Sequence, residues 1–125
     1  MKNILKRDYE KFNRKCENLI IKNLTIDNIE CGELGTCYHC NTIVGKLQIW
    51  LDKFYKYEKV YAVSLSFDIN EKEKLLDIFG ENYFKANINP FSGKMCIYAF
   101  EGMQDRAYIQ LYDVITALTD DEPQE

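Results

Sequence analysis

The sequence predicts an α+β domain, with helices packed on a small, largely antiparallel sheet of about three strands. Apolar residues recur at spacings of three and four over residues 3–22, which is the pattern of a helix with one apolar stripe. After Lys59 the apolar spacing becomes two, which is the period of a strand. A chain of 125 residues can bury a core of its own. We therefore expect one domain over residues 1–119 and an acidic, flexible tail with nothing to bury over residues 120–125.

The first helix carries a narrow stripe of apolar side chains. Its members are Leu5, Tyr9, Phe12, Cys16 and Leu19. Because free cysteine is among the residue types most often buried, we expect Cys16 to lie in the core. Residues 23–42 follow and are rich in Asn, Asp, Gly and Thr, so they are predicted to be irregular.

A second helix is predicted from Ile43 to Lys56. Leu47, Trp50 and Leu51 recur at helical spacing, and lysines gather toward the C-terminal end of this segment, where the helix dipole favours them. We therefore expect Trp50 to lie on the inner face of a helix and to pack in the core. A surface anchor is the alternative, because tryptophan is also frequent at interface hot spots.

The remaining elements alternate between the two periods. A strand is expected over residues 60–68, a short helix over 71–79 that stops at Gly80, and strands over 83–88 and 95–100. The last two strands are predicted to form a hairpin, because the connecting sequence NPFSG contains Pro and Gly. A final helix is expected from an Asp105 cap. Its inner residues are Tyr108, Leu111, Tyr112, Ile115 and Leu118.

Charge is uneven along the chain. The net charge is −4, and residues 1–22 carry seven basic and three acidic groups, a net of +4, so the remainder carries −8. An acidic body repels nucleic acid, which makes a protein with a basic surface the expected partner. The basic first helix is the alternative: it would bind nucleic acid or pair two subunits as a homodimer. Its charges are Lys6, Arg7, Lys11 and Arg14.

The chain contains no apolar run near the ~20 residues of a membrane span. Its first residues include no apolar stretch of the kind found in signal peptides. We therefore expect a cytoplasmic protein that does not enter membranes, with reduced thiols, because five cysteines do not form a complete set of pairs.

Residues 31–42, CGELGTCYHCNT, place three of the five cysteines beside the only histidine. Cys37 and Cys40 have the spacing that presents two sulfurs to one zinc ion, and Cys31 and His39 are candidates for further ligands. A structural zinc is one interpretation, although folding at this length requires no cofactor. Unligated thiols in a turn are another.

A third interpretation is thiol-disulfide chemistry. A CxxC at the start of a helix has a first thiol of lowered pKa, and His39 would stabilise its thiolate. Residues 37–80, about a third of the chain, resemble the thioredoxin family in the order CxxC, long helix, strand and short helix. The resemblance implies that Cys37 is the nucleophile, Cys40 the resolving thiol and Pro90 the family's cis-proline. The polar segment before Cys37 differs from that family, whose CxxC follows a hydrophobic strand.

No catalytic template other than the CxxC fits the sequence. One histidine and scattered glycines provide neither a catalytic triad, a phosphate-binding loop nor an HExxH motif. The nine tyrosines exceed what the expected inner faces can hold, and exposed tyrosines are typical of interfaces. The sequence therefore favours a small binding protein of inhibitor, immunity, antitoxin or anti-defence type, rather than an enzyme. The predicted contact residues are Tyr38, Tyr55, Tyr57, Tyr83 and Tyr98.

Overall fold

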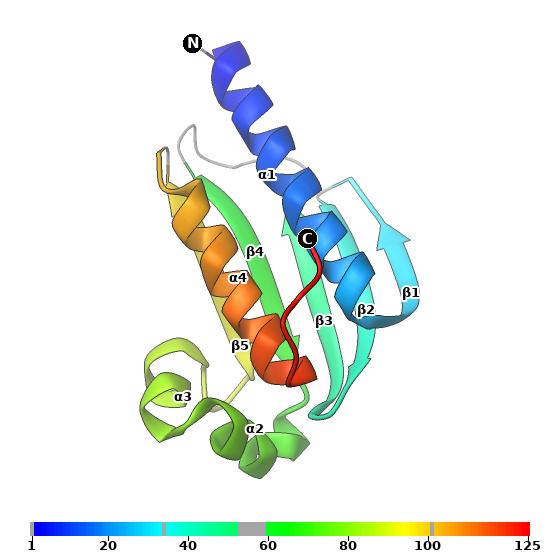
Figure 1. Cartoon of the computed structure of the whole chain (residues 1–125), viewed down its shortest axis with the longest axis vertical. Helices are drawn as coiled ribbons and strands as arrows, with labels where there is room; N and C mark the ends of the chain where they lie inside the picture. The colour runs from blue at the N-terminus through cyan, green and yellow to red at the C-terminus, as the bar shows by residue number, and fades with distance from the viewer. Residues whose placement is uncertain (1, 34, 53–59, 101) are drawn as a thin grey trace.

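The computed structural model describes residues 2–33, 35–52, 60–100 and 102–125 (Figure 1). Two helices, α1 (Lys2–Asn23) and α4 (Gln104–Thr119), lie across one face of a sheet. The architecture is α+β, as the sequence predicts.

The sheet has five strands rather than about three. They are β1 (Thr25–Cys31), β2 (Gly35–Thr42), β3 (Gly45–Asp52), β4 (Val60–Phe67) and β5 (Lys94–Phe100). The order across the sheet equals the order along the chain, and all four neighbouring pairs are antiparallel. A register shift between Ile26 and Asn28 interrupts the pairing of β1 with β2.

The predicted second helix is wrong, because its residues form β3. Leu47, Ile49 and Leu51 are buried and alternate with exposed residues, so the period is two. A tight turn before β3 starts the strand: the Thr42 hydroxyl donates to the Gly45 carbonyl at 2.9 Å, and Gly45 has a φ of 88°. Residues 23–42 are likewise β1 and β2 rather than irregular.

The other boundaries fall close to the predicted ones, with one exception. The helices over 3–22 and 71–79 and the strands over 60–68 and 95–100 are confirmed. The last helix is also found, but the predicted Asp105 cap is wrong: the helix begins at Gln104, its N-cap is Met103, and Asp105 lies in its first turn. The strand predicted over 83–88 is wrong: this segment is α3 (Glu81–Asn87), which follows α2 (Lys72–Phe79). The loop NPFSG therefore joins α3 to β5, and its turn is stabilised by the Asn89 side chain, which accepts from the amide of Phe91 at 2.9 Å.

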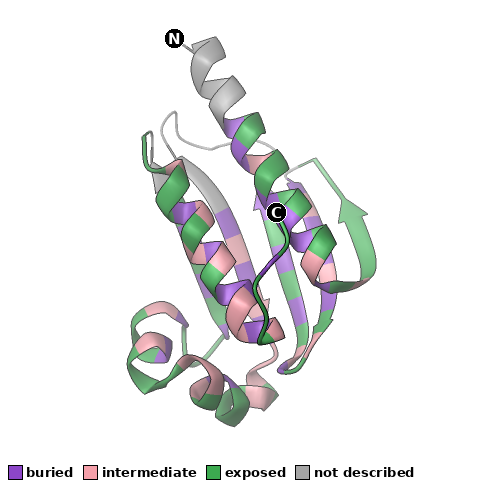
Figure 2. Ribbon diagram, viewed as in Figure 1, coloured by how far each residue is buried: buried purple, intermediate pink, exposed green. Residues whose placement is uncertain are grey.

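The core lies between the sheet and the two long helices, and both layers contribute buried residues to it. Figure 2 marks the buried residues on the ribbon. From α1 it takes Tyr9, Phe12, Cys16 and Leu19, which confirms the described part of the predicted stripe. The inner residues of α4 include Leu111, Ile115 and Leu118. Within the described ranges, no helix has the length and apolarity needed to cross a membrane.

The C-terminal segment returns from the end of α4 and runs between α1 and α4 (Figure 1). Pro123 in this segment is buried. Asn23 holds the neighbouring residue through its side-chain amide, which donates to the Gln124 carbonyl at 2.8 Å and accepts from the Gln124 amide at 2.7 Å. The prediction that residues 120–125 have nothing to bury was therefore wrong.

Candidate functional site

The face of the sheet opposite α1 and α4 is the candidate site. Within the described part of the chain no helix covers it, and its side chains alternate with the core residues along each strand. We call it the open face, and its described central residues are His39, Gln48, Trp50, Ser64, Cys96 and Tyr98.

One row of residues crosses the open face from edge to edge. The register pairs Glu30 with Cys37, Cys37 with Trp50, Trp50 with Ser64, and Ser64 with Cys96. The Ser64 hydroxyl lies 3.7 Å from the Cys96 sulfur. Small side chains thus occupy β4 and β5 beside the tryptophan.

Two aromatic side chains rise above these small residues. Trp50 is 38% exposed and Tyr98 is 57% exposed. They lie two strands apart and are offset by two residues, which places their Cα atoms roughly 12 Å apart. The open face therefore presents two small side chains, Ser64 and Cys96, next to two aromatic ones. Trp50 lies beside Ser64 on the neighbouring strand, and Tyr98 lies two residues from Cys96 along β5.

The open face carries few charges. The His39 ring nitrogen Nε2 lies 2.7 Å from a Glu30 carboxylate oxygen, so these two groups pair with each other. Lys46 and Lys94 are exposed on the same face. Acidic groups are exposed on the helix side instead, among them Asp113 in α4 and, beyond the end of this helix, Asp120, Asp121 and Glu122. The expected acidic surface that carries the tyrosines is therefore not found on this face.

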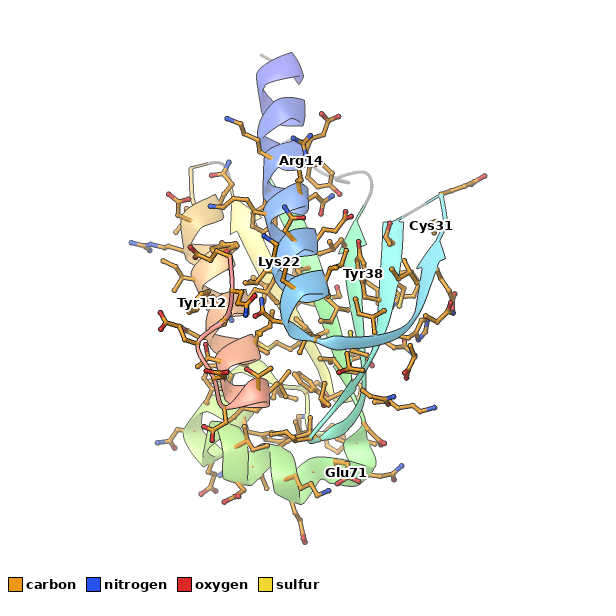
Figure 3. The ribbon with its side chains drawn as sticks, turned by 45° about the vertical axis from the view of Figure 1, so that its right-hand side comes forward. Arg14, Lys22, Cys31, Tyr38, Glu71 and Tyr112 are labelled. Atoms are coloured by element: carbon orange, nitrogen blue, oxygen red, sulfur yellow. The ribbon has the colours of Figure 1, made fainter. Side chains whose placement is uncertain are left out.

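The cysteine cluster is divided between the two faces of β2. Cys40 belongs to the core cluster on the helix side, whereas Cys37 lies on the open face in register with Trp50. Two residues three apart in a regular strand point to opposite faces, so their sulfurs cannot bind one ion or form a disulfide while β2 is intact. Cys31 lies at the far end of β1 (Figure 3). Among the described residues, no group of three Cys, His, Asp or Glu side chains is arranged to hold a metal.

The geometry also differs from a thioredoxin active site. Cys37 lies within a strand and not at a helix N-terminus, so that part of the interpretation was wrong. Burial and the nearby Glu30 carboxylate raise the pKa of Cys37, and burial raises the pKa of Cys40 to about 11. Both shifts oppose thiolate formation. The peptide bond before Pro90 is trans.

The five predicted contact tyrosines have different environments. Tyr98 is exposed on the open face, but Tyr38 is 2% exposed and lies on the helix side of β2 (Figure 3). Burial, followed by the Glu17 carboxylate, raises the pKa of Tyr38, and such a residue offers no surface to a partner. Tyr83 is half-buried and stacks on Phe79 with ring centroids 5.4 Å apart. Tyr55 and Tyr57 lie outside the described residues.

Trp50 is a contact candidate for which the sequence favoured the core, with a surface anchor as the alternative. It was predicted to pack in the core because its segment was interpreted as a helix. The alternation of Leu47, Ile49 and Leu51 would have placed it on the opposite face of a strand. Comparison with protein-family models, curated proteins and solved structures finds no match to this chain.

Proposed function

We propose that this chain is a non-catalytic binding protein that docks another protein on its open face. The observation that carries the proposal is the pair of exposed aromatic side chains, Trp50 and Tyr98, on a sheet face that no described helix covers. Modulation of a partner, as by an inhibitor or antitoxin, is the role proposed on size and composition.

The support is energetic. Tryptophan and tyrosine are the residues that most often contribute the largest share of binding energy at protein interfaces, because they bury a large area with few rotamers to fix. The backbone that carries Trp50 and Tyr98 is held rigid, since its other face packs in the core through Ile49 and Ile97. A partner would therefore pay little ordering entropy at this site.

The partner is proposed to carry a basic surface, for a long-range reason. The chain has a net charge of −4, which steers a basic protein toward it, while the proposed contacts on the open face are the aromatic Trp50 and Tyr98. We expect salt to slow association and to change the dissociation rate little.

Affinity capture from the source cell with the full chain tests the proposal. We expect the double variant Trp50→Ser/Tyr98→Ser to capture at least tenfold less of the partner than the original chain does. The matched control is Phe91→Ser, because Phe91 is 91% exposed and lies in the loop before β5, outside the strands that form the open face. A thermal melt of each variant establishes that it is folded. Retention of the partner by the folded double variant would refute docking on this face.

With the purified partner, Trp50 reports the contact directly. It is the only tryptophan of the chain, so the emission of the protein comes from the open face. We expect a blue shift on binding of a partner that lacks tryptophan, because the indole leaves water.

A further inference from the structure

A groove between α1 and α4 lies on the helix side, away from the open face. Its upper part is a cavity of about 590 Å³ lined by both helices. Among the described residues, the lining includes three cations of α1, Lys11, Arg14 and Lys15, and one acid, Asp105 of α4. In the part of the chain that the structure describes, none of the three cations forms an ion pair.

The lower part of the same groove already holds an acidic peptide segment. This is the C-terminal segment, residues 120–125, which runs up between the helices (Figure 1). A small cavity of about 150 Å³ joins the two parts: it is lined by Glu125 together with Lys15, Asn18 and Tyr108, which also line the large cavity. The segment therefore leads directly toward the basic cavity.

The contacts with this segment show that the lower part of the groove holds an extended peptide backbone. The Asn23 amide binds both the N–H and the C=O of Gln124, and the Lys22 ammonium donates to the backbone oxygen of Glu125 at 2.9 Å. These three hydrogen bonds select an extended peptide backbone of any sequence.

Two of the four acidic side chains of the segment are bound by phenols. Tyr108 and Tyr112 on α4 donate to the carboxylates of Glu125 and Glu122, each at 3.4 Å. Further up the groove, the Lys15 ammonium lies 4.4 Å from the centre of the Tyr108 ring. An acidic side chain of a bound ligand, placed in the groove beyond Glu125, would therefore contact the cations Lys15, Lys11 and Arg14. The two bound acidic side chains of the C-terminal segment contact phenols instead.

We propose that the α1–α4 groove is a second binding site, whose ligand is an extended acidic peptide of a partner protein seated in the basic cavity beside the C-terminal segment. Charge complementarity selects its acidic side chains. Recognition of the C-terminal segment through peptide N–H and C=O groups favours a polypeptide over a nucleic acid, which has no such alternation of donors and acceptors. The site goes beyond the proposed function, because it lies on the opposite layer.

Fluorescence anisotropy with the full chain tests this site. The probe is a fluorescein-labelled peptide of eight residues containing aspartate, glutamate and one proline, and the reference is the same peptide with asparagine and glutamine in place of the acids. We expect the acidic peptide to bind, more weakly at high salt, and the amide peptide to bind at least tenfold more weakly.

Charge reversal locates the site. Lys11→Glu/Arg14→Glu is expected to weaken acidic-peptide binding at least tenfold. The matched control reverses two exposed lysines outside the groove that form no ion pair among the described residues, Lys46→Glu/Lys72→Glu, and is expected to bind within twofold of the original chain. The Trp50→Ser/Tyr98→Ser variant is also expected to bind the peptide normally, which separates this site from the open face.

Three results would overturn the proposal. The first is no binding of the acidic peptide to the full chain. The second is an equal loss in the two charge-reversal variants, which would mean that net charge alone governs binding. The third is a single-stranded oligonucleotide of the same charge that binds as tightly as the peptide, which would make the groove a general polyanion site.

Discussion

The sulfur atoms of Cys37 and Cys40 belong to opposite faces of one strand, although only two residues separate them in the sequence. Cys37 lies beside Trp50 in the register, and Cys40 lies in the core. The two thiols are buried for different reasons, one between neighbours on the open face and one beneath the helix layer. At the scale of single residues, this division decides which cysteine chemistry is available.

We expect thiol reagents to distinguish the five cysteines. Cys31 and Cys96 are exposed and should react quickly with a disulfide reagent such as Ellman's, whereas Cys16, Cys37 and Cys40 are buried and should react only after unfolding. The measurement counts fast and slow equivalents in the native protein at neutral pH, with mass spectrometry to locate them. A Cys37 that reacts before Cys31 would contradict the structure and restore the redox interpretation.

The buried thiols also predict a pH dependence of stability. Burial raises the pKa of Cys16 to about 12 and that of Cys40 to about 11, above the ~8.5 of an unfolded thiol. The folded chain therefore keeps protons that the unfolded chain releases as the pH rises. These thiols leave the free energy of unfolding unchanged below about pH 8.5 and lower it progressively between about pH 8.5 and 12.

Urea unfolding across that pH range measures this effect. Cys16→Ala removes one of the two thiols, so the decline with pH should be shallower than in the original chain, whatever the variant loses in absolute stability. Equal slopes for the two proteins would show that Cys16 does not contribute.

At the scale of single residues, the sequence predicted burial correctly where an apolar stripe marks the inner face of a helix. The burial of Cys16 follows from its place between Phe12 and Leu19 on one helical face, and the structure confirms it. The faces on which Cys37, Cys40 and Trp50 lie could not be predicted, because each depends on whether the segment is a strand or a helix. The side on which a residue lies cannot be read before its element is known.

At the scale of elements, β3 shows why the two periods were confused. Leu47 and Leu51 are four apart, a spacing shared by a helical face and by one face of a strand. Ile49, between them, belongs to the strand pattern alone, and Trp50 belongs to the helical pattern alone. The deciding signal is the turn at Thr42 and Gly45, which commits the chain to a hairpin between β2 and β3.

The segment over 83–88 shows the opposite error, because it was predicted to be a strand and is a helix. Phe84 and Ile88 are both buried, and their spacing of four fits the α3 helix. Lys85 also pairs with Glu81 at 2.7 Å, an ion pair between residues four apart that a helix places side by side. Recognising that pair in the sequence would have favoured the helix.

Glycine substitution tests the turn before β5. Gly93 has a φ of 68°, and a Cβ at this position would lie 2.6 Å from the Phe67 carbonyl oxygen. We expect Gly93→Ala to destabilise the fold by about 2 to 4 kcal/mol, since both backbone strain and a shift of β4 are required. Gly102→Ala is the control: its φ is 83°, but its Cβ would meet no atom of the described residues within 4 Å, so strain alone of about 1 to 2 kcal/mol is expected. Chemical denaturation measures both, and equal losses would contradict the close approach.

Substitution of two asparagines, one at a time, measures how much the contacts of the C-terminal segment contribute to stability. Asn23 and Asn87 each donate a side-chain hydrogen bond to the carbonyl four residues earlier, to Leu19 and Tyr83 respectively. Only Asn23 also binds Gln124. We expect Asn23→Ala to cost about 1 to 2 kcal/mol more than Asn87→Ala in the free energy of unfolding. Equal costs would mean that the segment adds nothing to stability.

At the scale of the whole molecule, the two layers present two surfaces that face away from each other. The open face carries the aromatic Trp50 and Tyr98, and the α1–α4 groove is basic in its upper part. We expect the two sites to act independently. Saturation with the acidic peptide should leave the Trp50 emission unchanged, and the Lys11→Glu/Arg14→Glu variant should still capture the partner of the open face. A shift of the Trp50 emission on peptide binding would show that the layers are coupled.

The order of the strands predicts the order in which the parts of the chain fold. β2 and β3 are joined by two residues only, so their pairing closes a very short loop and should form early. β5 reaches β4 after α2 and α3, and α1 meets α4 from the other end of the sequence. These distant pairings carry the largest loss of chain entropy and should form late. The Asn23 contact with Gln124 spans 101 residues, so we expect it to be among the last to form during refolding and among the first to open during unfolding.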